Sequence, residues 1–222
     1  MKTFAKFSVS TVPFVTVGVL LYAALWIKPQ AAGSSVAPPA IARGDFIYGI
    51  TQPVGDSLLA AGSEGKVWRG SLGGPAWTLL PTPTKVNLQD IAAWDSRHAV
   101  AVGNDGVVIV SDDGGNSWRQ VDAPKSGVAN KLMRVRTAGA SEAWAVGEMG
   151  AVLHTKDFGA TWVRAAAEVD AAWNDVHAHA GKVWLVGEFG RIAYSADGGG
   201  NWKAVASPVK ASLMAIAYRD AA

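Results

Sequence analysis

The stretch SDDGGNSW, residues 111–118, contains residue types that could bind a metal ion or a phosphate group. It has two adjacent carboxylates, two glycines, and hydroxyl and amide side chains. A calcium loop of the EF-hand type needs more oxygen ligands at alternate positions and a closing glutamate. The stretch has neither. We therefore expect a structural turn rather than a metal site.

Two further pairs of side chains could do chemistry. His177 and His179 alternate along an expected strand, so both rings face the same side and could ligate a metal ion. No third ligand is evident near them, which favours two polar strand residues. Glu148 and Glu188 occupy the same place in consecutive VGEMG and VGEFG hairpins. They could form a carboxylate pair for general acid–base work, but charges at hairpin tips are normally solvated, and we favour that interpretation.

Basic residues gather in one expected inner strand. Arg134 and Arg136, with Lys131, form a modest cluster there. Together with Arg191 and Lys66 they could contribute to a binding face for a partner. Scattered surface charge is an equally good interpretation of the same residues.

The elements that carry these residues repeat along the chain. The residues that open the expected inner strands are 41, 44, 41 and 40 positions apart: Ile47, Leu88, Leu132, Trp173 and Leu213. Glycine pairs of a G-x-x-G hairpin recur in the same phase: Gly62/Gly65, Gly103/Gly106, Gly147/Gly150 and Gly187/Gly190. Tryptophans follow in step at Trp77, Trp118, Trp162 and Trp202. Columns in phase at this spacing indicate a repeat architecture.

Each unit is expected to hold four short strands with no helical period. In the second unit these are LQDIAAWD, HAVAVG, GVVIVS and WRQVD. A repeated four-stranded unit of 40 to 45 residues is typical of a β-propeller blade, which buries its two faces by stacking. The sequence thus predicts an all-β propeller domain over 46–222. Its blades are expected at about 46–82, 88–124, 132–168 and 173–208, followed by an extra inner strand at 213–220.

The opening stretch also recurs at the blade spacing. The three copies are Ser111-x-Asp113-x-Gly115-x-Ser117-Trp118, Thr155-x-Asp157-x-Gly159-x-Thr161-Trp162 and Ser195-x-Asp197-x-Gly199-x-Asn201-Trp202. The pattern resembles the Asp-box, or bacterial neuraminidase repeat; the first unit has only SLGGPAW, without the aspartate. An aspartate in such a turn can accept hydrogen bonds from unpaired backbone N–H groups, and glycine permits positive φ. We expect a structural role for all three boxes.

Sialidases share this box, and the resemblance makes hydrolysis an alternative. Sialidase chemistry uses an arginine cluster, a tyrosine nucleophile beside a glutamate, and an aspartate acid–base, on a six-bladed ring. Outside the N-terminal segment the tyrosines are Tyr48, Tyr194 and Tyr218, and none lies in a motif tied to that chemistry. We predict no catalytic residues and no enzyme activity.

Composition narrows the classes of partner and cofactor. The 222-residue chain has a formal net charge of +2 and is 50% hydrophobic. Its small positive excess is spread along the sequence, which does not indicate nucleic-acid binding. The chain has no cysteine, which excludes disulfides and thiolate metal sites. We expect no cofactor.

The N-terminal segment predicts a membrane anchor. Lys2 and Lys6 precede an uncharged apolar run over 8–27, which is about the length of a spanning helix. We expect 1–7 in the cytoplasm, a single-pass signal anchor in the inner membrane over 8–27, and a tether over 28–45 rich in Pro, Ala and Ser. The propeller is then expected on the periplasmic or lumenal side. A signal peptide cleaved near Ala31-Ala32 is the alternative.

The phrases AVGEMGAVLHTKDFGATW and LVGEFGRIAYSADGGGNW go beyond a generic box. They resemble the photosystem II stability and assembly factor family and its bacterial relatives, over about residues 46–219. The resemblance implies a non-catalytic propeller that binds a membrane-protein partner through a basic patch. The nearest counterparts of that patch here are Arg134, Arg136 and Arg191. Family members have seven blades, and some bacterial relatives are thought to accompany exporters of the resistance-nodulation-division type.

We therefore predict a membrane-anchored scaffold, or an assembly or accessory factor, for a membrane protein complex. The partner complex would be of the photosystem II type or an exporter. The alternative is a sialidase-like protein that binds or hydrolyses glycans. Since four blades and a strand are fewer than a full ring, self-association or a partner that completes the ring is also expected.

Overall fold

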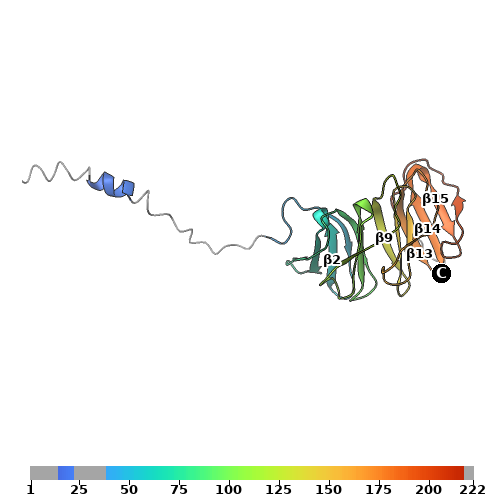
Figure 1. Cartoon of the computed structure of the whole chain (residues 1–222), viewed down its shortest axis with the longest axis horizontal. Helices are drawn as coiled ribbons and strands as arrows, with labels where there is room; N and C mark the ends of the chain where they lie inside the picture. Colours follow the sequence, from blue (N-terminus) through green and yellow to red (C-terminus); the bar gives the residue numbers. More distant parts are fainter. Residues whose placement is uncertain (1–14, 23–38, 218–222) are drawn as a thin grey trace, which may run out of the picture. The chain divides into compact units, whose positions relative to one another are not determined.

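The computed structural model describes residues 15–22 and 39–217 (Figure 1). The chain divides into two compact units, Met1–Pro38 and Pro39–Ala222. In the first unit, residues 15–22 form a helix with exposed side chains. The rest of the predicted span 8–27 lies outside the described residues, as do 1–7 and the first part of the tether. Among the helices in the described ranges, none is long and apolar enough to cross a membrane.

The second unit is built from four antiparallel four-stranded sheets, each formed by four consecutive strands. We number these sheets as blades 1 to 4. Blade 1 comprises β1 (Ile47–Thr51), β2 (Ser57–Gly62), β3 (Val67–Ser71) and β4 (Thr78–Leu80). Blade 2 comprises β5 (Leu88–Ala93), β6 (Ala99–Gly103), β7 (Val108–Ser111) and β8 (Arg119–Val121). Blade 3 comprises β9 (Leu132–Ala138), β10 (Glu142–Gly147), β11 (Val152–Thr155) and β12 (Val163–Arg164). Blade 4 comprises β13 (Trp173–His179), β14 (Lys182–Gly187), β15 (Ile192–Ser195) and β16 (Lys203–Val205). The predicted all-β, propeller-like fold of four-stranded antiparallel units is confirmed.

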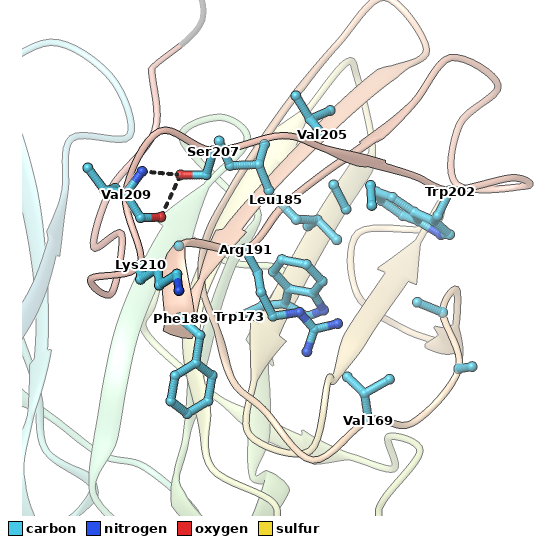
Figure 2. A pocket seen from close by; sticks show the side chains of 16 residues that line it. Val169, Trp173, Leu185, Phe189, Arg191, Trp202, Val205, Ser207, Val209 and Lys210 are labelled. Carbon is cyan, nitrogen blue, oxygen red and sulfur yellow. Dashed lines mark hydrogen bonds between the residues drawn. The ribbon is translucent and has the colours of Figure 1, made fainter.

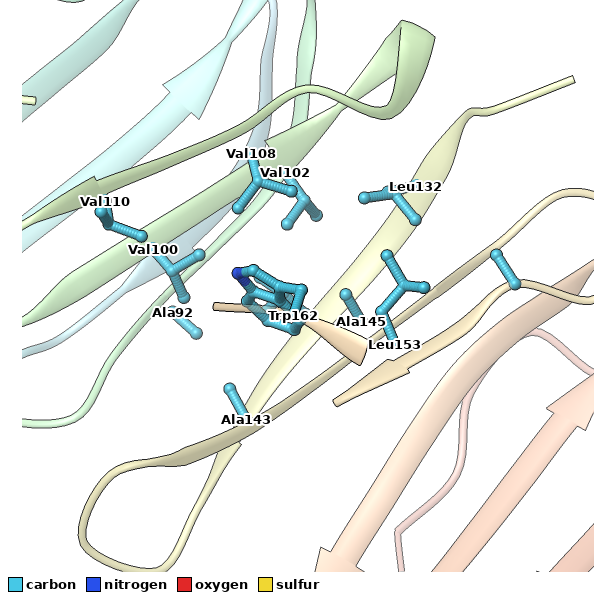
Figure 3. Packing of buried hydrophobic residues seen from close by; sticks show 12 residues of the cluster. Ala92, Val100, Val102, Val108, Val110, Leu132, Ala143, Ala145, Leu153 and Trp162 are labelled. Atoms are coloured by element: carbon cyan, nitrogen blue, oxygen red, sulfur yellow. The ribbon is translucent and has the colours of Figure 1, made fainter. Parts of the chain in front are cut away.

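The hydrophobic core lies between successive blades, whose inner strands β1, β5, β9 and β13 are neighbours in that order. Strand β6 is buried along its whole length, because one face packs on blade 1 and the other on blade 3. Its sequence AVAVG is accordingly a continuous apolar run rather than a polar–apolar alternation. Between blades 2 and 3, small and β-branched residues surround the ring of Trp162 (Figure 3). Trp118 takes the same place between blades 1 and 2, and Trp202 packs against the core between blades 3 and 4.

The G-x-x-G hairpins join the second and third strands of the blades and form tight turns. Three of them are 3-10 turns: η1 (Ser63–Gly65), η2 (Asn104–Gly106) and η3 (Glu188–Gly190). In η3, Gly190 has φ +69°, and a Cβ there would lie 1.9 Å from the carbonyl oxygen of Val209. The second glycine of the motif is therefore required both for its conformation and for the close approach of the chain that leaves the blade.

The extra strand predicted at 213–220 does not form within its described part, residues 213–217. The Leu213 amide donates to the Gly187 carbonyl at 3.0 Å, and the Ile216 amide donates to the Asp175 carboxylate at 3.1 Å. The segment thus runs beside β13 and is held by isolated hydrogen bonds. It is not a β-strand, because these bonds do not build a backbone ladder. Residues 218–220 lie outside the described residues.

Candidate partner-binding site

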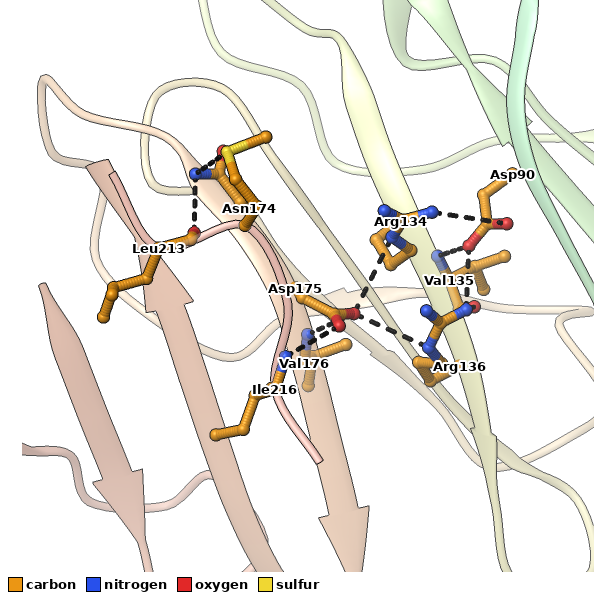
Figure 4. A network of polar contacts seen from close by, with 10 residues as sticks. Asp90, Arg134, Val135, Arg136, Asn174, Asp175, Val176, Leu213 and Ile216 are labelled. Carbon is orange, nitrogen blue, oxygen red and sulfur yellow. Dashed lines mark hydrogen bonds and ion pairs between the residues drawn. The ribbon is translucent and has the colours of Figure 1, made fainter. Parts of the chain in front are cut away.

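Two buried aspartates and two arginines form a charged network on the inner strands of blades 2, 3 and 4 (Figure 4). Arg136 lies 3.2 Å from Asp90 through Nη1 and 3.5 Å from Asp175 through Nε. Arg134 lies 4.0 Å and 3.8 Å from the same two carboxylates. Each arginine therefore bridges the aspartates of the two neighbouring blades.

The aspartates occupy one column of the repeat. Asp90 pairs with Val102, and Asp175 pairs with Val186, at the same place in their ladders; Arg134 takes this place in blade 3. The carboxylates bond to backbone amides of inner strands, which are edge strands with free N–H groups. Asp90 accepts from the Val135 amide at 3.0 Å, and Asp175 accepts from its neighbour Val176 at 3.0 Å.

The charges of this network largely cancel. Both aspartate side chains are only 3% exposed, whereas Arg134 is 30% and Arg136 is 43% exposed. Burial raises the pKa of Asp90, while the bonded Val135 amide and the two arginines oppose that rise. The predicted basic cluster is thus present, but it is compensated by two acids that sequence analysis missed. What remains at the surface is the exposed part of two guanidinium groups, which have more N–H donors than the aspartates use; the Nε of Arg134 is buried without a hydrogen-bond partner.

Arg191 does not join this network. Its guanidinium lies over the ring of Trp173, 4.9 Å from the ring centroid. The three arginines proposed as counterparts of a basic patch therefore fall at two separate places. Lys131 lines a cavity of about 190 Å³ next to the network. The residues around that cavity are Tyr48, Gln89, Lys131, Met133, Arg134, Asn174 and Met214.

The sialidase alternative requires an arginine cluster with a tyrosine in one pocket. Tyr48 and Arg134 do line the same small cavity, but Arg134 is the single arginine among its described residues. Tyr194 lies against Trp184, with ring centroids 4.3 Å apart. Tyr218 lies outside the described residues. The described part of the chain therefore does not assemble the sialidase set.

The Asp-box turns bond to their own backbone. In the second unit, Asp113 Oδ1 accepts from the Ser117 amide and from Ser111 Oγ, both at 2.9 Å, and Oδ2 accepts from Ser117 Oγ at 2.6 Å. Ser111 Oγ in turn accepts from the Gly115 amide at 2.7 Å. These bonds lower the pKa of Asp113 to about 2, with the Ser117 side chain as the main cause. The Asp113 carboxylate therefore stabilises its own turn through these hydrogen bonds.

The other two copies have the same geometry. Asp157 accepts from the Thr161 amide at 2.9 Å, and Asp197 accepts from the Asn201 amide at 2.8 Å. The hydroxyls of Thr155 and Ser195 bond to their aspartates and accept from the amides of Gly159 and Gly199. Across the described ranges, no cluster of three His, Cys, Asp or Glu side chains could hold a metal ion.

The remaining candidates also have structural partners. Glu148 accepts from the Lys131 amide at 3.0 Å, and Glu188 accepts from the Ala172 amide at 2.8 Å. Each glutamate thus bonds to the backbone at the start of its own blade's inner strand, rather than being simply solvated or paired with the other. His177 lies opposite Trp184 in the β13–β14 ladder.

Sequence analysis could have found the buried acids. Asp90 and Asp175 each stand two positions after a residue that opens an expected inner strand, Leu88 and Trp173. An acid at that position in two units, with an arginine at the equivalent position of the unit between them, is a legible signal. Its meaning becomes clear only when neighbouring inner strands are placed side by side.

Comparisons with known proteins agree with this architecture. The family model described as "Photosynthesis system II assembly factor YCF48" matches residues 72–218, about two thirds of the chain. A curated relative, the photosystem II assembly lipoprotein Ycf48 of Synechococcus sp. (strain CC9902), is 30% identical over 90 residues. That match covers 40% of this chain and 26% of the relative.

Solved structures show the same fold. YCF48 bound to D1 peptide has a TM-score of 0.57 at 16% identity, covering 76% of this chain and 60% of that one. YCF48 from Cyanidioschyzon merolae has a TM-score of 0.59 at 16% identity, covering 77% and 59%. An ancestral GH74 enzyme also has a TM-score of 0.59 at 16% identity, covering 79% of this chain and 26% of that one.

The solved structures and the family model support different conclusions, the first about the fold and the second about the family. The three solved structures named above, each at 16% identity, show the fold alone, and one of them is an enzyme. The chain spans about a quarter of the curated relative and about three fifths of the two Ycf48 structures. The family model, in contrast, matches most of the four-bladed unit. This chain therefore belongs to the Ycf48 photosystem II assembly factor family.

Proposed function

We propose that this chain is a non-enzymatic scaffold, or an assembly or accessory factor, that binds a membrane-protein partner through Arg134 and Arg136. Family membership over residues 72–218 is the observation that carries the proposal. One Ycf48 relative is described as a photosystem II assembly lipoprotein, and one Ycf48 structure is bound to a D1 peptide.

The geometry supports recognition of acidic or carbonyl groups. Arg134 and Arg136 are held on either side by Asp90 and Asp175, so little side-chain freedom is lost when a partner binds. A guanidinium has five N–H donors in a rigid fork, and the aspartates use only some of them. The free donors can meet carboxylates or backbone carbonyls of a partner. The near-neutral balance of the network favours a specific contact over general attraction to acidic surfaces.

The proposal places the propeller outside the cytoplasm. Residues 8–27 act as a single-pass anchor in the inner membrane, 28–45 as a tether, and 46–222 as the periplasmic or lumenal domain. A photosystem II-type complex and an exporter of the resistance-nodulation-division type are both candidate partners.

A charge-matched variant tests the proposed site. Replacing the arginines alone would leave two buried acids unpaired and would damage the fold. The test variant is therefore R134Q/R136Q/D90N/D175N, which removes all four charges together and keeps hydrogen-bonding side chains. Full-length protein is used to isolate partners from gently solubilised membranes, and the main captured membrane protein is purified and rebound.

The expected result is that the fourfold variant melts like the wild type but loses the partner. Two controls accompany it: D90N/D175N, which keeps both arginines, and Arg97→Gln, which changes an exposed arginine away from the network. Both should retain the partner. Equal capture by the fourfold variant would refute the assigned site. Turnover of a glycoside by protein that captures no partner would favour the sialidase-like alternative.

A further inference from the structure

The interface between blades 3 and 4 departs from the repeat at three points. The first is the wall supplied by blade 3. Ala165 stands where blade 1 has Leu80 and blade 2 has Val121, and all three follow the recurring tryptophan of their unit by three positions. Ala166 and Ala167 come next. The apolar side chain that fills this part of the other two interfaces is therefore reduced to a methyl group.

The second departure is the position of Trp202. Trp118 and Trp162 each donate their indole N–H to the glycine carbonyl of their own box, at 3.2 Å and 3.0 Å. Trp202 instead donates to the Ala165 carbonyl of blade 3, at 2.9 Å. The large ring of Trp144 lies beside this turn: an added Cβ on Gly199 would be only 2.6 Å from it, and it packs edge-on against the Trp202 ring, with centroids 6.3 Å apart.

The third departure is a charged residue at a core position. Blades 2 and 3 have Val107 and Ala151 directly after the G-x-x-G turn, each 6% exposed. Blade 4 has Arg191 there, stacked on Trp173. Trp173 itself stands where blades 2 and 3 have Leu88 and Leu132. Among the described residues, no carboxylate lies within ion-pair distance of Arg191.

Together these changes leave a pocket of about 570 Å³ at this interface (Figure 2). Its walls include Leu185, Trp202, Val205 and Val169, and the Arg191 side chain extends between the Trp173 ring and Val169. Pockets that hold small organic ligands have volumes of roughly 300 to 1,000 Å³, with apolar walls and a few polar groups. The pocket fits this description. Two cations line it: Lys210, which is exposed, and Arg191, whose guanidinium lies against the aromatic face of Trp173.

We propose that this pocket binds a small amphiphile that has one carboxylate attached to an apolar chain or ring. The carboxylate is placed on Arg191, whose planar fork matches it and whose stacking on Trp173 fixes its position. The apolar part lies against Leu185, Val205 and Trp202, where burial of its surface drives binding. This role goes beyond the proposed partner binding, because the pocket includes neither Arg134 nor Arg136.

Calorimetric titration of the full-length chain tests the proposal. Octanoate and 2-naphthoate serve as probes of the aliphatic and aromatic forms of the ligand. Octan-1-ol and 2-naphthalenemethanol are the matched uncharged controls, and octylamine is the control of opposite charge. We expect at least one carboxylate to bind about tenfold more tightly than its alcohol, since a hydrogen-bonded ion pair in a partly buried site is worth about that factor. The carboxylate that binds identifies the form of the ligand.

Two variants locate the binding. Arg191→Gln keeps a hydrogen-bonding side chain and should weaken the carboxylate about tenfold while leaving the alcohol unchanged. Ala167→Leu narrows the pocket without touching the charge and should weaken both. Arg97→Gln, at a distant exposed arginine, should change neither. If Arg191→Gln proves misfolded by circular dichroism, Ala167→Leu decides by itself.

Three results would overturn the proposal. One is that neither carboxylate binds at millimolar concentration. Another is that carboxylate and alcohol bind equally well. The third is that binding survives Arg191→Gln in a folded variant, or survives Ala167→Leu.

Discussion

The carboxylate of Asp113 should stabilise the fold through the turn that it holds, and Asp113→Asn should reveal this as a pH-dependent loss. The carboxylate accepts two hydrogen bonds from Ser117 and one from Ser111. Asparagine keeps the shape and one acceptor oxygen but loses the charge that strengthens these bonds. The variant should therefore fold and lose a defined part of its free energy of unfolding.

The size of the loss follows from the pKa of Asp113. The turn lowers that pKa from 3.8 to about 2. A difference of this size would correspond to about 2.4 kcal/mol at about 1.36 kcal/mol per pKa unit. Because the side chain is exposed, solvent screening reduces the contribution, and we expect about 1 kcal/mol near pH 6.

The direction of the pH dependence follows from the lowering of the Asp113 pKa in the folded state. A carboxyl whose pKa is lower in the folded state stabilises the protein fully above pH 3.8 and loses that effect as the pH falls toward 2. The difference between wild type and Asp113→Asn should therefore be full at pH 6, about half at pH 3, and close to zero below pH 2.

Urea unfolding of the wild type and variant at pH 6 and pH 3 measures this difference. The matched control is Asp112→Asn, at the adjacent carboxylate, whose contact with Arg119 is an exposed 3.6 Å ion pair. It should change the free energy of unfolding by about 0.5 kcal/mol or less. Millimolar calcium should stabilise none of the three proteins. A loss that is the same at both pH values, or a calcium-dependent rise confined to the wild type, would refute the structural role.

Three further outcomes are expected. Trp162→Ala should lower the free energy of unfolding by about 3 to 5 kcal/mol, since its ring is 6% exposed between blades 2 and 3; an unchanged urea midpoint would contradict this. Burial beside Trp144 lowers the pKa of His154, so the wild type should lose stability as the pH falls below 6.5. His154→Phe should lack this loss when melting curves at pH 7 and pH 5 are compared. Asp175→Ala should cost about 2 kcal/mol and speed hydrogen exchange at the Ile216 amide, which loses its acceptor; unaltered exchange there would count against the contact.

Much of the blade architecture could be predicted from local pattern. Short apolar runs such as AVAVG and GVVIVS, separated by glycine turns, identify strands because a pleated strand buried on both faces needs small and β-branched side chains. The Asp-box could also be interpreted correctly, since its hydrogen bonds join residues no more than four positions apart. The conformation of residues 213–217 could not be predicted, because their sequence resembles an inner strand while their backbone makes only isolated hydrogen bonds.

The candidate site was predicted less completely. Arg134 and Arg136 stood out as basic residues in one strand, but their partners Asp90 and Asp175 are about 40 residues away in either direction. Nothing local in the sequence indicates that those acids neutralise the arginines. Arg191 was grouped with the other two by charge, yet it lies in a different pocket.

The repeat, the turns and the strands can be inferred from local sequence pattern, because they depend on interactions among residues close together in the chain. Which charged side chains meet, and where a pocket is left between blades, depends on the packing of distant segments. Ion pairs between inner strands depend on how the blades stack, and the pocket at Arg191 depends on Ala166 and Ala167 of one blade facing a displaced Trp202 of the next. Packing across an interface responds to the summed volume of both sides, which no single repeat unit encodes.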